Sequence, residues 1–156
     1  MKESSEVKLK IPPPIVTLVF GVLMFFLDEL YSFDVVSIVI RNGVIAVLLF
    51  VASFLLFPAV AQFYKNKTTV NPFKPEKTKV LVVEGVYRYS RNPMYLGMAL
   101  VLLAWGVFLS NPVNVITFFG FIFYMNYFQI KPEEYALDNI FGDSFQKYRL
   151  RVRRWI

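Results

Sequence analysis

Two groups of polar residues in this chain have the types and the spacing of a ligand site. The first is a run of aromatic and basic side chains around an asparagine: Tyr87, Arg88, Arg91, Asn92 and Tyr95. The second is the acidic pair Glu133-Glu134. The chain has no histidine and no cysteine, which excludes imidazole bases, thiolate nucleophiles and the usual zinc or haem ligand sets. We therefore expect no metal at this site.

Aromatic rings, an arginine and two carboxylates suit a cationic, zwitterionic cofactor. A sulfonium is attracted to aromatic faces and an amino group to carboxylates, while backbone groups between Leu81 and Gly85 could hold an adenine or a ribose. Methyl transfer from a sulfonium needs mainly alignment and exclusion of water. A site without histidine or cysteine is chemically sufficient for that reaction.

Both groups also have a purely mechanical interpretation. Asn92 would cap a helix whose first residue is Pro93, and Gly97 would allow another helix to pack closely. Lys131-Pro132 would begin a further helix, with the two carboxylates at its positive end. Adjacent acids at membrane depth are nevertheless costly without a partner. Arg91 or a cationic ligand could be that partner.

The elements that position these residues are predicted to be membrane helices. Of the 156 residues, 56% are hydrophobic and 18% charged, which is more apolar surface than one soluble core of this size buries. Four uncharged apolar stretches are candidate spans, namely Ile15 to Leu27, Val44 to Ala61, Met94 to Leu109 and Val113 to Ile130. The fold class is therefore all-α integral membrane, with about four transmembrane helices.

The distribution of basic residues predicts the orientation. Seven lie between Gln62 and Pro93 and six after Ile130, whereas the connection from Asp28 to Arg41 is net acidic. By the positive-inside rule, both termini and the active site should be cytoplasmic. The net charge is +6, and the basic residues flank apolar segments, where anionic lipid head groups are nearby. The lipid bilayer is therefore the expected partner, and nucleic acid is not.

The third and fourth stretches are joined only by Ser110 to Pro112, so they should form a tight helical hairpin. This brings the segment before Met94 and the segment after Ile130 to one face of the membrane. Beyond the hairpin, apolar residues recur with helical spacing and are interrupted at Gly142-Asp143, which predicts two short amphipathic helices. We treat residues 1–156 as one domain, with two N-terminal helices (1–61) followed by a loop, the hairpin and the C-terminal segment (62–156).

At these residues the sequence resembles the isoprenylcysteine carboxyl methyltransferase and phospholipid methyltransferase family of membrane enzymes. The resemblance rests on Arg91 to Gly97, on Gly85-Val86-Tyr87 before it and on Glu133-Glu134 after the hairpin. It begins near Thr69 to Pro72 and continues through Phe141-Gly142, Tyr148 and Val152 to Trp155. It covers roughly the C-terminal half of the chain.

The resemblance implies an S-adenosyl-L-methionine cofactor on the cytoplasmic side, in a pocket closed by the residues after the last helix. The implied cofactor contacts are Lys79, Val80, Leu81, Val82, Tyr87, Asn92, Pro93, Met94, Tyr95 and Glu133, with Glu134 as the neighbouring acid. Arg91 and Gln129 are the candidate substrate-binding residues.

Two positions depart from the family pattern. Members often have histidine where this chain has Asn92, and an amide cannot act as a base. The prenylcysteine-specific enzymes have an arginine where this chain has Gln129, and a neutral amide cannot form the bidentate charged pair with a substrate carboxylate. Carboxyl methylation of prenylcysteine is therefore in doubt, although methyl transfer is not.

The leading hypothesis is a membrane methyltransferase whose lipophilic substrate, a small molecule, a lipid or a prenylated compound, enters laterally from the bilayer. An NADPH-dependent sterol-type reductase is the second interpretation, although such enzymes usually have many more spans. A non-enzymatic scaffold that binds anionic lipid is the third. The methyl acceptor stays open among carboxylate, thiol, phenol and amine groups.

Overall fold

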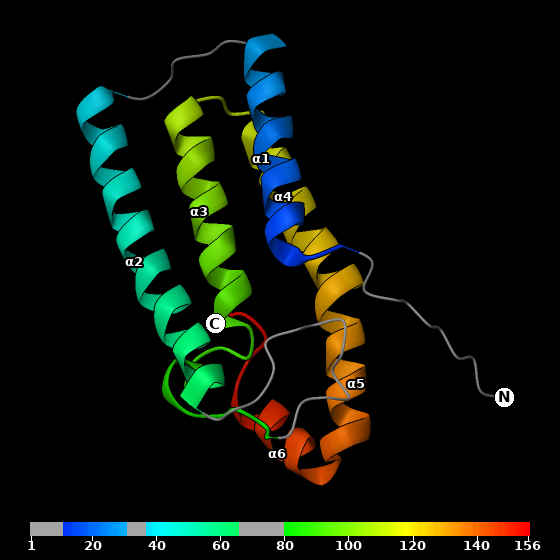
Figure 1. The fold of residues 1–156 in the computed structure, drawn as a ribbon. Helices are drawn as coiled ribbons and strands as arrows, with labels where there is room; N and C mark the ends of the chain where they lie inside the picture. Colours follow the sequence, from blue (N-terminus) through cyan, green and yellow to red (C-terminus); the bar gives the residue numbers. More distant parts are fainter. Residues whose placement is uncertain (1–10, 31–36, 66–79) are drawn as a thin grey trace, which may run out of the picture.

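The computed structural model describes residues 11–30, 37–65 and 80–156 of the protein. Within these ranges the chain is helical and contains no strand, which confirms the predicted all-α class. Figure 1 shows the helices, which are α1 (Pro13–Leu30), α2 (Ile38–Lys65), α3 (Pro93–Leu109), α4 (Asn114–Tyr124), α5 (Lys131–Phe141) and α6 (Asp143–Arg151). A 3-10 turn, η2 (Gly85–Arg88), precedes α3, and a π-helical segment, η3 (Met125–Ile130), joins α4 to α5.

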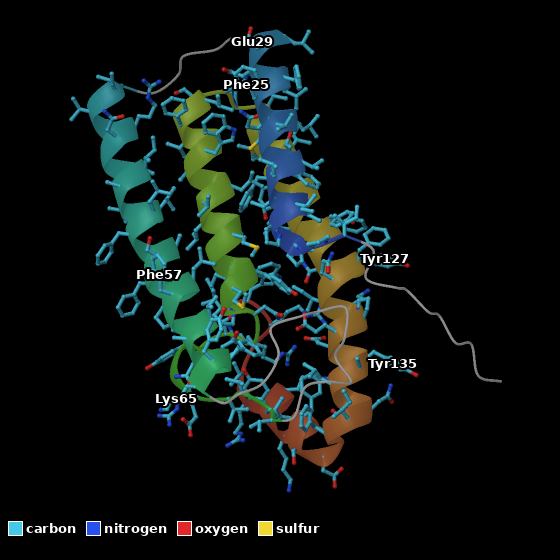
Figure 2. The ribbon with its side chains drawn as sticks, in the orientation of Figure 1. Phe25, Glu29, Phe57, Lys65, Tyr127 and Tyr135 are labelled. Carbon is cyan, nitrogen blue, oxygen red and sulfur yellow. The ribbon has the colours of Figure 1, made fainter. Side chains whose placement is uncertain are left out.

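The first two helices have the length and the exposed apolar faces of membrane spans. α1 has 18 residues and α2 has 28, and only 17% and 11% of their apolar windows are buried within the protein. Side chains such as Phe26 and Phe57 stay exposed, and Figure 2 shows Phe57 pointing away from the bundle. A core helix of a soluble protein would bury such residues, so the chain is an integral membrane protein. α3 is a shorter apolar helix of 17 residues, and the number of four spans stays a prediction.

α3 is the central helix of the bundle, with α2 on one side and α1 and α4 on the other (Figure 1). Gly97 makes the contact with α2 possible, as expected from the sequence. A Cβ atom at this position would lie 2.5 Å from Cγ of Leu56 and 3.3 Å from the backbone oxygen of Ala52. Absence of a side chain at Gly97 therefore sets the separation of α2 and α3.

The predicted hairpin of α3 and α4 is confirmed. Ser110 ends α3 in the left-handed conformation, with φ of 59°. The Asn111 side chain then accepts a hydrogen bond from the backbone N–H of Val113 at 3.0 Å. Its amide donates to Asp28 at 3.2 Å, which ties the turn to the end of α1. A turn this short leaves α3 and α4 antiparallel and side by side.

The helix expected to begin at Lys131-Pro132 does not follow a turn. α5 begins at Lys131, but Ile130 is itself helical (φ −70°, ψ −46°), so α4, η3 and α5 form one continuous column (Figure 1). Pro132 offers no N–H, and a proline ring inside an α-helix clashes with the carbonyl four residues earlier, here that of Phe128. Phe128 lies within η3, and the wider π-helical turn accommodates the proline without breaking the column.

The two short C-terminal helices are also confirmed. α5 ends at Phe141, the following Gly142 has φ of 48°, and α6 folds back from there. Their common core is a cluster of Phe145, Tyr148 and Val152, against which Leu81 and Val83 pack. α6 therefore packs on the segment that leads into α3.

The close contact at Gly97 generates a stability prediction. Gly97→Ala should lower the thermal unfolding temperature, because the clash with Leu56 and Ala52 costs about 1–3 kcal/mol, more than the gain in helix propensity of about 1 kcal/mol. Gly43→Ala in α2 is the matched control, since a Cβ atom there meets nothing within 4 Å. Circular dichroism melting in detergent measures both. An unchanged or raised midpoint for Gly97→Ala would contradict this account of α2–α3 packing.

Candidate functional site

The two polar groups singled out in the sequence meet at one end of the bundle. The hydroxyl of Tyr95, in the first turn of α3, donates a hydrogen bond to Oε2 of Glu133 in α5 at 2.9 Å. The two residues are 38 positions apart, and the hairpin of α3 and α4 brings them together. Tyr95 is buried, and Glu133 is partly exposed.

The neighbouring acid, Glu134, has quite different partners. Arg91 donates to its Oε1 at 2.7 Å, and Arg154 donates to its Oε2 at 2.6 Å and to its Oε1 at 3.2 Å. The three side chains expose only 10%, 12% and 32% of their surface for Arg91, Glu134 and Arg154 respectively. Of the two expected partners for the acids, Arg91 or a cationic ligand, the structure shows Arg91, and the acid that it neutralises is Glu134.

Glu133 has no such cation among the residues that the structure describes. Among the described residues, the hydrogen-bond partner of Glu133 is Tyr95, and no described lysine or arginine forms an ion pair with Glu133. The pKa of the Glu133 carboxyl group is raised to about 7, chiefly because the group is buried. The hydrogen bond from Tyr95 opposes this rise, and the nearby charge of Glu134 adds to it. The result is a partly buried carboxyl group with a pKa near neutral pH and no positive partner in the described part of the chain.

The C-terminal segment after α6 crosses the site. The backbone N–H of Arg91 donates to the carbonyl of Arg153 at 3.0 Å, and its guanidinium donates to the carbonyls of Arg149 and Val152. Asn92 occupies the N-cap position of α3, as expected, but its side chain does not cap the helix. Its amide instead donates to the carbonyl of Arg154 at 3.0 Å. The start of α3 therefore holds the end of the chain in place.

The segment before α3 also contributes residues to the site. Val82 and Tyr87 are buried and pack on Ala59 of α2. Burial raises the pKa of the Tyr87 hydroxyl, and the charge of Glu133 raises it further. The Tyr87 carbonyl accepts a hydrogen bond of 2.7 Å from the hydroxyl of Tyr148 in α6. Tyr87 is thus fixed, neutral and electrostatically coupled to Glu133.

The remaining candidate cofactor residues differ in burial and in packing partners. Pro93 is buried at the first position of α3, and Met94 packs into both neighbouring core clusters. Leu81 packs towards α6, whereas Val80 is 44% exposed. Lys79 and the stretch from Thr69 to Pro72 lie outside the described residues.

Gln129 is turned towards α1. It is 1% exposed, and its amide donates to the carbonyl of Ile11, just before α1, at 2.7 Å. Its Oε1 is buried without a partner among the described residues. The structure thus joins Gln129 to the start of α1, while Arg91 stands at the acidic pair.

Two residues of this centre were not singled out from the sequence as site residues. Arg154 is one of six basic residues after Ile130, and nothing in their spacing marks it as the second partner of Glu134. Asn126, in η3, accepts hydrogen bonds from Arg154 at 3.4 Å and Trp155 at 3.2 Å. The available signal was its place within the uncharged stretch from Val113 to Ile130, where polar groups are costly, but Asn114 and Gln129 share that stretch and nothing distinguished Asn126 from them.

Comparison with known proteins shows that the chain is similar to O-methyltransferases. An uncharacterized protein of Haemophilus influenzae is 43% identical over 63 residues, which is 40% of this chain and all of that protein. The protein-S-isoprenylcysteine O-methyltransferase of Schizosaccharomyces pombe is 31% identical over 94 residues, 60% of this chain and 40% of that enzyme. Protein-S-isoprenylcysteine O-methyltransferase B of Arabidopsis thaliana is 31% identical over 88 residues, 56% and 45% of the two chains. This chain thus spans less than half the length of these two methyltransferases.

No solved structure matches the chain. The family model described as phospholipid methyltransferase matches residues 41–144, which include most of α2, the hairpin, η3 and α5. This range contains both halves of the site, Arg91 to Tyr95 and Glu133-Glu134. Because the match covers well over half of the sequence, the chain belongs to the phospholipid methyltransferase family.

Proposed function

We propose that this protein is an S-adenosylmethionine-dependent methyltransferase that acts on a lipophilic acceptor in the membrane. The observation that carries the proposal is the unequal treatment of the two neighbouring acids. Glu134 is neutralised by Arg91 and Arg154, whereas Glu133 is held by a phenol and has no cation among the described residues. Because an unpaired carboxylate is costly to bury, a cationic group bound beside Glu133 would stabilise its ionised form.

The residues around Glu133 fit the different parts of S-adenosylmethionine. The Glu133 carboxylate would hold the α-ammonium group of the cofactor. The neutral rings of Tyr95 and Tyr87 would face the positively charged sulfonium. Leu81 and Val82 would supply an apolar wall for the adenine. The sequence-based expectation also assigned Glu134 to the cofactor, and backbone groups between Leu81 and Gly85 to its adenine or ribose. Glu134 is paired with Arg91 and Arg154, so we propose Glu133 as the acid that contacts the cofactor.

Bound S-adenosylmethionine supplies an electrophilic methyl group, and the protein's own residues align the acceptor and keep water out. The C-terminal segment, held by Arg91 and Asn92, covers the start of α3. An acceptor carried on a lipophilic chain would enter from the bilayer, because the apolar surfaces of α1 and α2 face lipid. Support for methyl transfer comes from the family and from the names of the two similar O-methyltransferases.

We further propose that the site and both termini are cytoplasmic. Apart from Arg41, near the start of α2, the described basic residues lie at the site end of the bundle, at the end of α2 and on η2, the segment before α3, α5, α6 and the C-terminal segment. Figure 2 shows Lys65 at this end and Glu29 at the opposite end. This distribution is the one that the positive-inside rule associates with the cytoplasmic face.

Glu133→Gln should weaken binding of S-adenosylmethionine by about tenfold or more, since a hydrogen bond to a charged group contributes about 1.5–3 kcal/mol. Glu29→Gln makes the same charge change on an exposed residue far from the site and should leave the affinity unchanged. Calorimetric titration of the purified protein measures both, with NADPH as the alternative ligand. Absence of S-adenosylmethionine binding at millimolar concentration, or preferential binding of NADPH, would refute the proposed function.

The pKa of Glu133 also predicts how binding depends on pH. Because the carboxyl group of the free protein has a pKa of about 7, it must lose its proton to bind an ammonium group. Affinity should therefore rise with pH through 7 and be about tenfold weaker at pH 6 than at pH 8, which is the ratio of ionised fractions. Glu133→Gln should flatten this dependence. An equally steep profile in the variant would assign the titration to another group.

A further inference from the structure

The backbone carbonyl of Tyr87 does not receive the hydrogen bond that a continuing helix would give it. In a regular helix this carbonyl would accept from the N–H of Ser90 or Arg91. The N–H of Ser90 donates instead to the carbonyl of Val86 at 3.3 Å. The N–H of Arg91 donates to the carbonyl of Arg153 at 3.0 Å. The Tyr87 carbonyl therefore stands at the end of η2, where a side chain has to satisfy it.

The hydroxyl of Tyr148 in α6 is the donor that satisfies this carbonyl. The hydrogen bond is 2.7 Å long, is buried and joins residues that are 61 positions apart. The Tyr148 ring is itself buried in the cluster with Phe145 and Val152, against which Leu81 packs. Packing of the ring thus brings the hydroxyl to the Tyr87 carbonyl. Because an unpaired buried carbonyl is costly, this bond fixes the end of η2 to α6.

The Tyr87 ring is held from another side by α2. It meets the Phe63 ring edge to face, with a centroid distance of 5.7 Å and an interplanar angle of 83°, and it packs with Ala59 and Val82. Burial raises the pKa of the Tyr87 phenol, and the charge of Glu133 raises it further, so the phenol lies near this carboxyl group. Tyr87 therefore joins α2 and α6 close to the candidate cofactor site.

We propose that Tyr148 is a positioning residue for cofactor binding, because its hydroxyl holds the Tyr87 backbone and so keeps the Tyr87 ring close to Glu133. This inference rests on the proposed function, in which Glu133 binds the ammonium group of S-adenosylmethionine and Tyr87 faces its sulfonium. It gives α6 a part in cofactor binding that acts through the backbone of another segment. Without the hydroxyl, the Tyr87 carbonyl would turn towards water, the ring would lose its fixed place, and water would reach Glu133.

The ionisation of Glu133 distinguishes positioning from a general effect on stability. Burial is the chief reason why its pKa is about 7, so access of water should lower this pKa towards the ordinary value. The titratable groups that act on Glu133 in the described part of the chain are Tyr95 from α3, Tyr87 from η2 and Glu134 from α5. Glu134 is paired with the guanidinium groups of Arg91 and Arg154. Ionised Glu133 is the form that binds an ammonium group, so a lower pKa moves the rise of affinity to lower pH.

Tyr148→Phe removes the hydroxyl and keeps the packed ring. It should weaken S-adenosylmethionine binding at pH 8 about fivefold, the effect of one typical hydrogen bond. It should also lower the pH of half-maximal affinity by about 0.5 or more. Tyr135→Phe is the matched control, because Tyr135 in α5 is 70% exposed and Figure 2 shows it pointing away from the bundle. Calorimetric titrations across neutral pH measure both variants and the parent.

Tyr87→Leu tests the other end of the same link. It keeps an apolar side chain against α2 and removes the aromatic ring, so it should weaken binding and lower the same pH of half-maximal affinity. Adding Tyr148→Phe to this variant should weaken binding no further, because residues that act as one unit are not additive. Circular dichroism melting reports whether each variant is folded, and Tyr87→Leu alone tests the link if Tyr148→Phe does not fold.

The outcomes separate this proposal from the proposed function. If the parent binds S-adenosylmethionine and Tyr148→Phe lowers only the melting midpoint, with affinity and pH profile unchanged, the role of Tyr148 is overturned alone. An equal loss of affinity in Tyr135→Phe, or additive losses from Tyr148→Phe and Tyr87→Leu, would overturn it as well. A parent that does not bind S-adenosylmethionine refutes the proposed function, and the role of Tyr148 in cofactor binding with it.

Discussion

Two adjacent carboxylates at the end of an apolar helical column are the main physical constraint on this structure. Each would be costly next to the membrane without compensation, and the chain compensates them differently. Glu134 receives two guanidinium groups, from the start of α3 and from the C-terminal segment. Glu133 receives one phenol hydroxyl. The first arrangement holds three segments together, and the second leaves a carboxyl group whose pKa of about 7 makes it responsive to a cation.

Two local features of the backbone create this arrangement. The tight turn at Ser110 and Asn111 returns α4 along α3, so that the start of one helix and the end of the other meet. The π-helical segment η3 then carries the column past Pro132 without a break, and it presents Asn126 towards the C-terminal residues. A break at Pro132 would have separated Glu133 from Tyr95. The irregular helix is therefore part of the site rather than a defect next to it.

Those parts of the fold and site that depend on short-range constraints could be predicted from the sequence. A connection of three residues requires a hairpin, and Gly97 predicts close helix packing. The high cost of an unpaired acid predicts a partner for the glutamates, either Arg91 or a cationic ligand. The choice between Glu133 and Glu134 depends on side-chain directions in a folded structure, so it could not be made in advance. The same holds for Arg154, which is one of several similar basic residues. The expected cap by Asn92 is not formed: its amide N–H donates to the carbonyl of Arg154, and its side-chain oxygen accepts no hydrogen bond from the first turn of α3.

The positions at which this chain departs from the family pattern also limit its chemistry. The amide groups of Asn92 and Gln129 both donate to backbone carbonyls, those of Arg154 and Ile11, so their donors serve the structure. Neither amide can accept a proton as a base, and Glu133 is needed for the cofactor's ammonium group. A nucleophile that is already an anion reacts without a base, and an amphiphile with a neighbouring phosphate or carboxylate can give its proton to that group. The shortage of bases thus favours an acceptor that is already an anion or that carries its own proton-accepting group.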